Sequence, residues 1–119
     1  MYDISNMARL KRYCGSYLLE IDNGRIKEYC GSYKYELSGT NVRRYCGNYV
    51  YSIEGNKIKE YCGRYLLEVN GNTIREYCGR NIATIEGNRI REYCGSYLYE
   101  IDGFISHQDL MMLIAVLFA

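Results

Sequence analysis

Two short strand-like patterns recur along most of the chain. Within each, apolar side chains occupy alternate positions, as in residues 65–69, and a second stretch, 73–77, follows after Gly71 and Asn72. Apolar side chains at every second position are typical of a strand that is buried on one face. Gly-Asn and Asn-Gly dipeptides accept positive φ and favour two-residue hairpin turns. The pattern therefore predicts a β-hairpin.

The hairpin pattern returns at a constant interval of 16 residues. Six Tyr-Cys-Gly tripeptides open the repeats, with their cysteines at Cys14, Cys30, Cys46, Cys62, Cys78 and Cys94. A period this short excludes the common helical repeats and the four-stranded propeller blades, whose units span about 33 to 50 residues. The Cys-Gly dipeptide predicts a second turn in each unit, with the glycine in the positive-φ conformation that other residues resist.

The domain organisation follows from the repeat. A chain of 119 residues is typical of a single domain, and we assign residues 1–119 to one. Residues 1–12 form a degenerate first repeat, and residues 13–105 form six hairpin repeats, the last of them incomplete. Residues 106–119 form a buried helix. Residues 1–7 are also a candidate thirteenth strand.

The charges of successive repeats distinguish between two architectures that 16-residue units allow. A solenoid would stack a column of positive side chains as a like-charge ladder, which is unfavourable. That column consists of Lys27, Arg43, Lys59, Arg75 and Arg91. An antiparallel meander instead places Glu54 opposite Lys57 and Ile53 opposite Ile58, so that opposite charges and β-branched side chains pair. The meander is favoured, with one mostly charged face and one apolar face. By alternation, the apolar face carries Ile58, Tyr65, Leu67, Val69 and Ile74.

The end of the chain carries the one long apolar segment. Ser106 and Asp109 resemble a helix N-cap with an acidic first turn, and residues 110–119 are apolar on every side. A helix that is apolar all round is buried all round, whereas an open sheet would cover only half of it. We therefore predict an all-β fold with one C-terminal helix, in which a closed barrel of about 12 strands is plugged by the helix. The alternative is an open, curved single sheet with the helix on its apolar face.

Composition and charge narrow the function classes. Lys and Arg number 15 against 14 Asp and Glu, and this net charge of +1 argues against a nucleic-acid binder, which is normally basic. A hydrophobic content of 48% argues against disorder. Residues 1–12 lack the apolar run of a signal peptide, and the run 110–119 is too short for a membrane span. We expect a soluble, cytoplasmic protein that binds neither nucleic acid nor a membrane.

The residues that could carry chemistry favour structural roles. Neighbouring Cys-Gly turns should lie about 10 Å apart, which is too far for disulfides, so reduced thiols are expected. No CxxC spacing occurs and His107 is the sole histidine, so we predict neither a metal site nor a cofactor nor catalytic residues. Four glutamates beside the turns would form a functional ring if they pointed inward, but a wet rim or a bulge explains them more simply. They are Glu28, Glu60, Glu76 and Glu92.

A column of tyrosines is the candidate ligand-binding feature. It consists of Tyr13, Tyr29, Tyr45, Tyr61, Tyr77 and Tyr93. Alternation places it on the outer face, next to lysines and arginines. Aromatic rings flanked by polar groups bind sugars or protein partners, and they also simply cover a sheet beneath stacked arginines.

The units between Tyr13 and Asp102 resemble the short Tyr- and Gly-punctuated hairpin repeats of bacterial proteins, such as the YD-type and beta-flower repeats. The resemblance rests on the order of short strands and turns within each unit. It implies a bacterial repeat domain and no particular activity, and it assigns no functional residues.

Three functions are compatible with these observations. The first is a non-enzymatic structural or interaction module, which binds a protein partner or a second copy of itself. Catalysis needs a few unlike groups that converge at one place, whereas repetition multiplies like groups, so we expect no enzyme. The second is a multivalent sugar- or ligand-binding protein that uses the outer tyrosines. The third is a membrane-active protein that releases its C-terminal helix.

Overall fold

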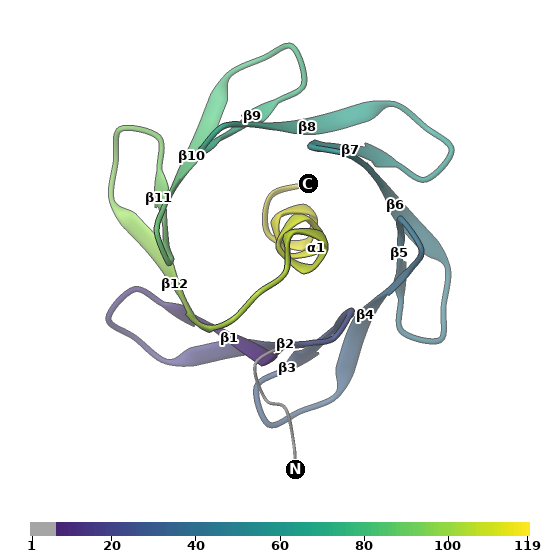
Figure 1. Ribbon diagram of the computed structural model, residues 1–119, viewed down its shortest axis with the longest axis horizontal. Coiled ribbons are helices and arrows are strands. Elements are labelled where there is room, and N and C mark those ends of the chain that lie inside the picture. The colour runs from purple at the N-terminus through teal and green to yellow at the C-terminus, as the bar shows by residue number, and fades with distance from the viewer. Residues whose placement is uncertain (1–6) are drawn as a thin grey trace.

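In the computed structural model, which describes residues 7–119, antiparallel strands close into a barrel around one helix (Figure 1). The strands are β1 (Met7–Arg12), β2 (Tyr17–Asp22), β3 (Arg25–Glu28), β4 (Tyr33–Ser38), β5 (Asn41–Arg44), β6 (Tyr49–Glu54), β7 (Lys57–Glu60), β8 (Tyr65–Asn70), β9 (Thr73–Glu76), β10 (Asn81–Glu86), β11 (Arg89–Glu92) and β12 (Tyr97–Gly103). The helix is α1 (His107–Phe118). Each strand pairs with its neighbours in the sequence, and β1 pairs with β12 to close the ring. The barrel of about 12 strands is confirmed, and the open sheet is not formed.

The strand register confirms the meander that the charges predicted. Glu54 lies opposite Lys57 and Ile53 lies opposite Ile58 across the β6–β7 hairpin. The two-residue turns have the expected chemistry, because Gly71 at the first turn position has a φ of +64°. The candidate thirteenth strand falls on residues 1–6, outside the described part of the chain, except for Met7, which belongs to β1.

The Tyr-Cys-Gly turns form the ends of six hairpins that project outward from the barrel (Figure 1). We call these hairpins the arms and number them in chain order, so that arm 1 consists of β1, β2 and the turn between them, and arm 6 consists of β11, β12 and the turn between them. The expectation that glycine supplies the positive φ in these turns is wrong. The cysteines do so, with φ between 54° and 55°. Glycine is needed for space instead, because a Cβ on Gly63 would lie 2.8 Å from the Cβ of Glu60.

A β-bulge in the second strand of each arm corrects the assignment of one tyrosine. Ile58 lies opposite Leu67, but Lys59 lies opposite Tyr65, so Leu66 is an extra residue on β8. The extra residue shifts the alternation by one position and turns Tyr65 to the outer face, away from the apolar side where strict alternation placed it. Leu67 and Val69, beyond the bulge, remain buried as predicted. The same shift occurs at the corresponding position of the other arms.

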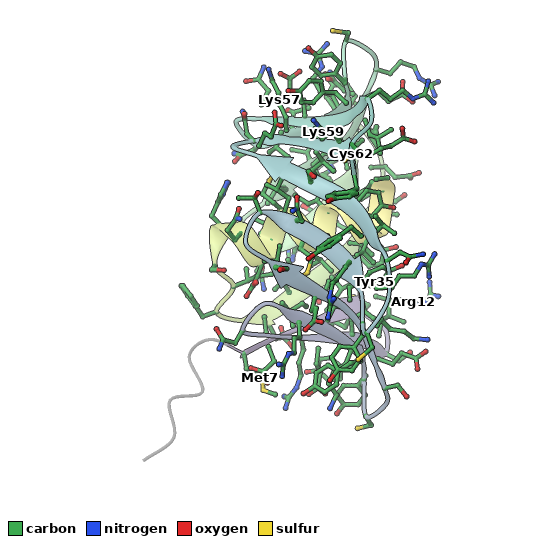
Figure 2. All side chains as sticks on the ribbon, turned by 90° about the vertical axis from the view of Figure 1, so that its right-hand side faces the viewer. Met7, Arg12, Tyr35, Lys57, Lys59 and Cys62 are labelled. Carbon is green, nitrogen blue, oxygen red and sulfur yellow. The ribbon has the colours of Figure 1, made fainter. Side chains whose placement is uncertain are left out.

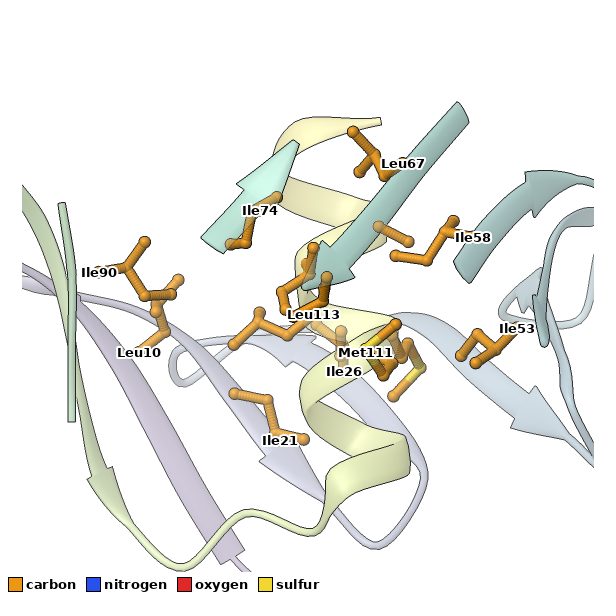
Figure 3. Packing of buried hydrophobic residues seen from close by; sticks show 14 of the residues in the cluster. Leu10, Ile21, Ile26, Ile53, Ile58, Leu67, Ile74, Ile90, Met111 and Leu113 are labelled. Atoms are coloured by element: carbon orange, nitrogen blue, oxygen red, sulfur yellow. The ribbon is translucent and has the colours of Figure 1, made fainter. Parts of the chain in front are cut away.

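The core lies between the inner face of the barrel and α1 (Figure 3). Every strand after a short turn contributes one fully buried aliphatic side chain at the same position: Ile26, Val42, Ile58, Ile74 and Ile90. Five consecutive helix residues, Met111 to Ala115, are buried on all sides. The helix begins after Ser106, whose Oγ accepts a hydrogen bond from the backbone N–H of Asp109 at 3.2 Å, as the N-cap pattern predicted. Leu110 and residues 116–118 are only half-buried, so the fully enclosed part is shorter than the predicted 106–119.

Candidate functional site

The outer face of the barrel is organised by stacked pairs of tyrosines in the grooves between neighbouring arms. In five of the six grooves, a tyrosine from the turn of one arm stacks on a tyrosine from the neighbouring arm, with ring centroids 4.8–5.1 Å apart. The pairs are Tyr13–Tyr97, Tyr17–Tyr29, Tyr33–Tyr45, Tyr49–Tyr61 and Tyr65–Tyr77. Offset stacking at this separation is the favourable geometry for aromatic pairs. Each pair therefore fastens one repeat to the next.

A cation and a carboxylate complete each of these five filled grooves. Between arms 4 and 5, the Nζ of Lys59 lies 5.6 Å from the centroid of the Tyr65 ring and 3.4 Å from a carboxylate oxygen of Glu54. The equivalent Arg91 lies over the Tyr97 ring at 5.3 Å and 3.1 Å from a carboxylate oxygen of Glu86. Figure 2 shows Lys57 and Lys59 side by side on the outer face. On this solvent-facing surface, the carboxylate therefore neutralises the cation, and the cation also lies over the face of the ring.

In three of the five pairs, a tyrosine hydroxyl donates a hydrogen bond to a carboxylate, whereas the hydroxyl of Tyr49 donates to the Oγ of Ser38 at 3.4 Å. The hydroxyl of Tyr65 donates to Glu54 at 2.5 Å, and the hydroxyl of Tyr97 donates to Glu86 at 3.0 Å. This hydrogen bond favours the charged carboxylate, so the pKa of Glu54 is lowered and the pKa of Tyr65 is raised. Tyr17 donates in the same way to Asp102 across the closure of the ring, and its pKa is raised too.

The sixth groove, between arms 5 and 6, has a different composition. Asn81 stands where the other grooves have the second tyrosine, so Tyr93 has no ring partner among the described residues. Its exposed fraction is 46%, against 38% for the paired Tyr77. Asn70 stands where Glu54 and Glu86 stand in the neighbouring repeats, and Thr73 stands where they have Lys57 and Arg89. We call this place the Tyr93 groove.

Arg75, on β9 beside the Tyr93 groove, differs from every equivalent cation. Its register partner on β10 is Asn81, and its partner on β8 is Glu68. Its Nη2 donates to the carbonyl of Gly79 at 3.1 Å, but its Nε is buried and has no hydrogen-bond partner within residues 7–119. The five equivalent side chains each form an ion pair and lie over a tyrosine ring, whereas Arg75 does neither within that range: these are Lys11, Lys27, Arg43, Lys59 and Arg91.

The other residues that the sequence singled out are not brought together. The six cysteines are free and exposed at the arms, and residues 7–119 contain no group of three potential metal ligands. His107 is exposed in the first turn of α1. The four glutamates beside the turns are exposed at the arms, as expected for residues at a solvent-exposed rim. In the described chain, no helix has the length and apolar character to cross a membrane.

The structure therefore separates the six tyrosines that the sequence named as candidate binders. Tyr13, Tyr29, Tyr45, Tyr61 and Tyr77 each have one ring face covered by a partner, and Tyr93 does not. Sequence reasoning missed the partner column and the residues of the sixth groove. The signal was present, because tyrosine recurs every 16 residues at 17, 33, 49, 65 and 97 and is replaced by asparagine at 81.

Together these features define a closed antiparallel barrel of six hairpin repeats with a helix along its centre. Comparison with known proteins gives no match to any family model, curated protein or solved structure.

Proposed function

We propose that this chain is a non-enzymatic interaction module, in which a rigid barrel presents six arms to a protein partner. The observation that carries the proposal is the arrangement of the arms: all six have the same turn, each turn holds an exposed cysteine with positive φ, and all project from the same ring. Several weak contacts that are made at the same time can add up to strong binding when a scaffold holds them in a set geometry.

The barrel supports this role because it holds the arms in a set geometry. Closure leaves no free sheet edge, and the helix fills the centre with side chains that are almost completely buried. Tyrosine pairs between neighbouring arms add further rigidity. The ends of the arms remain accessible, and the side chain of Arg80 in arm 5 is 88% exposed.

The surface chemistry supports binding more than catalysis. The charged side chains of the outer face are largely repeated copies that neutralise one another in ion pairs, such as Arg43 with Glu36 at 2.7 Å. An active site gathers a few unlike groups at one place. Exposed free thiols suit a reducing compartment, so the proposal places the protein in the cytoplasm.

The other two functions that the sequence allowed have less support. Multivalent sugar binding by the outer tyrosines would need free ring faces, and five of the six have a stacked neighbour. Membrane activity through release of α1 would require Met111 to Ala115 to leave the centre of the barrel, which would empty its core.

Site-specific photocrosslinking in the cells that make the protein tests the proposal. A photoreactive residue replaces Arg64 at the end of arm 4 in one variant and Asn72, in a short turn between the arms, in a control variant; both positions are exposed. The proposal predicts a discrete crosslinked partner from position 64, and competition by excess unlabelled protein. A crosslink to a second copy would identify self-association through the arms. Absence of a discrete adduct from position 64, or equal adducts from both positions, would contradict the proposal.

A further inference from the structure

The end of the barrel that carries the turns of the arms also contains the end of the helix. Helix α1 begins beside the short turns, where the backbone N–H of Gly24 donates to Asp109 at 3.4 Å, and it extends along the centre of the barrel. Met7 and Arg12, the first and last residues of β1, lie at opposite ends of the barrel in Figure 2. The last turn of α1 therefore reaches the end at which the arms turn. We call this end of the molecule the arm face.

The centre of the arm face is apolar and only half-buried. Val116, Leu117 and Phe118 pack against the core, and part of each side chain stays exposed. The extra residues that the bulges add to the arms pack against the same core and are also half-buried in four arms: they are Leu18, Val50, Leu66 and Ile82. Exposed apolar side chains inside a polar border are typical of a surface that binds another protein.

The residue before each Tyr-Cys-Gly tripeptide is charged and borders the arm face. In chain order these exposed residues are Arg12, Glu28, Arg44, Glu60, Glu76 and Glu92. They lie opposite inner-face residues of the neighbouring strands, as Glu76 lies opposite the buried Leu67 and Glu92 opposite the buried Ala83. Residues that lie directly opposite each other in a sheet share one face of it, so these charges are on the inner side of the arms.

Two of the six border charges are neutralised within the chain, and four are not. Glu28 forms an ion pair with Lys34 at 3.8 Å, and Glu76 forms an ion pair with Arg80 at 3.8 Å. Within residues 7–119, the other four border residues have no ion pair: they are Arg12, Arg44, Glu60 and Glu92. The unpaired charges are therefore two arginines and two glutamates on four different arms.

A second copy of the chain matches these charges. Two arm faces can meet around a two-fold axis that passes between arms 3 and 4 and between arms 6 and 1, which are neighbours because β12 pairs with β1. Arms 1, 2 and 3 then face arms 6, 5 and 4 of the other copy. Arg12 faces Glu92 of the other copy, and Arg44 faces Glu60 of the other copy. Among the in-plane two-fold axes of a ring of six arms, only this axis matches each unpaired arginine with an unpaired glutamate.

We propose that the arm face binds the arm face of a second copy, with the apolar centres in contact and the border charges paired across the interface. A second copy is then the partner of the arms, so this interface rests on the interaction role proposed above. Viewed along the barrel axis, the molecule measures 44 × 33 Å (Figure 1), which is wide enough for the roughly 800 Å² per partner of a standard interface. The two-fold axis makes every contact occur twice.

Sedimentation velocity of the full chain under reducing conditions, at about 1 to 200 µM protein, tests this interface. We expect a dimer whose Kd rises at least about threefold between about 50 mM and 500 mM salt, because salt screens the exposed border charges. Arg44→Glu replaces an attraction by a repulsion between carboxylates and should raise Kd about tenfold or more. The control Asn72→Glu adds a negative charge at an exposed short turn, at the opposite end of the barrel, and should leave Kd unchanged.

Exchange of charges identifies which arms face each other. Arg44→Glu combined with Glu60→Arg exchanges the signs within one facing pair, so the dimer should recover. Arg44→Glu combined with Glu92→Arg has the same net charge but places like charges opposite each other in both pairs, so the dimer should not recover. All three positions are exposed, and circular dichroism verifies that each variant is folded.

Dimerisation that recovers only in the exchange of Arg44 with Glu60 supports the interface. A wild-type chain that stays monomeric at about 200 µM would overturn it, as would a dimer that Arg44→Glu does not weaken or equal results for the two double variants. A monomeric chain that still yields a discrete crosslinked protein from position 64 would overturn the interface and leave the interaction role standing. A monomeric chain without such an adduct would overturn both.

Discussion

The inner and outer faces of the barrel are completed in different ways. On the outer face, neighbouring repeats cover one another through ion pairs and, at five of the six places between arms, through tyrosine pairs. On the inner face, the repeats present a ring of aliphatic side chains that cannot reach across the centre, and a segment outside the repeat fills the space. The 16-residue units therefore supply the contacts between neighbouring repeats, but their side chains cannot fill the centre of the barrel that they form.

This difference sets the expected cost of a substitution. An outer side chain contacts one or two neighbours and water, so its loss is local. An inner side chain borders a core that all repeats and the helix share, and α1 of 12 residues is about 18 Å long and extends along that core. Substitutions that distinguish the two faces therefore test the comparison directly.

The largest effect is expected from removal of the segment that fills the centre. Deletion of residues 106–119 removes Met111, Met112, Leu113 and Ile114, all at 1% exposure or less. At about 1.5–3 kcal/mol for each buried side chain, the loss is comparable to the whole stability of a typical domain. We expect the truncated chain to unfold or aggregate, as measured by circular dichroism and size-exclusion chromatography. A truncated chain that keeps a cooperative unfolding transition at the original temperature would show that the repeats need no helix.

A neighbouring pair of residues on β7 compares the two faces within one strand. Ile58→Asp places a charge in the core and should cost about 4 kcal/mol or more. Lys59→Asp loses an ion pair and a cation–π contact at the surface and should cost about 1 kcal/mol. The free energy of unfolding, measured by denaturant titration, gives both values. Similar losses for the two variants would mean that the register is wrong by one residue.

A smaller effect concerns the buried acid at the start of the helix. Desolvation raises the pKa of Asp109, with a further contribution from Asp22, and a hydrogen bond from the Gly24 backbone N–H opposes the shift. A raised pKa in the folded state means that stability is fully present below the ordinary aspartate value and is lost as the pH rises through the folded pKa.

Asp109→Asn removes this titration and keeps a hydrogen-bond acceptor. The free energy of unfolding of the variant, minus that of the wild type, should therefore increase as the pH is raised from the ordinary aspartate pKa towards neutrality. Parallel denaturant titrations across that range measure the difference. A difference that decreases over the same range would show that the folded state favours the charged carboxylate.

The sequence predicted the features that depend on repetition and on side-chain polarity. The pairing of Glu54 with Lys57 identified the meander, and the uniformly apolar residues 110–119 identified a buried helix. Closure followed from the need to cover that helix on all sides. Each of these inferences used a property that the residue types carry with them.

The bulge and the arm turns were missed because their signals are weak in the sequence. One extra residue, Leu66, reverses the direction of Tyr65, and nothing in the strand pattern marks it. Cys62 has the positive φ that Gly63 was expected to have, because contact with Glu60 decides where glycine is required. The Tyr93 groove was also missed. It differs from the other grooves because Asn81 stands where they have a tyrosine, and that set of tyrosines faces outward only because of the bulge.

The central claim is that the barrel encloses its helix on every side, and an aspartate scan of residues 111–115 tests it most directly. These five consecutive positions cover more than one full turn of α1. We predict that each substitution lowers the melting temperature by about 10 °C or more, or prevents folding, while the control His107→Asp at an exposed position does not. A loss that varies with the helical period, with at least one position accepting aspartate within about 0.5 kcal/mol, would show a wet helix face and contradict the enclosed helix.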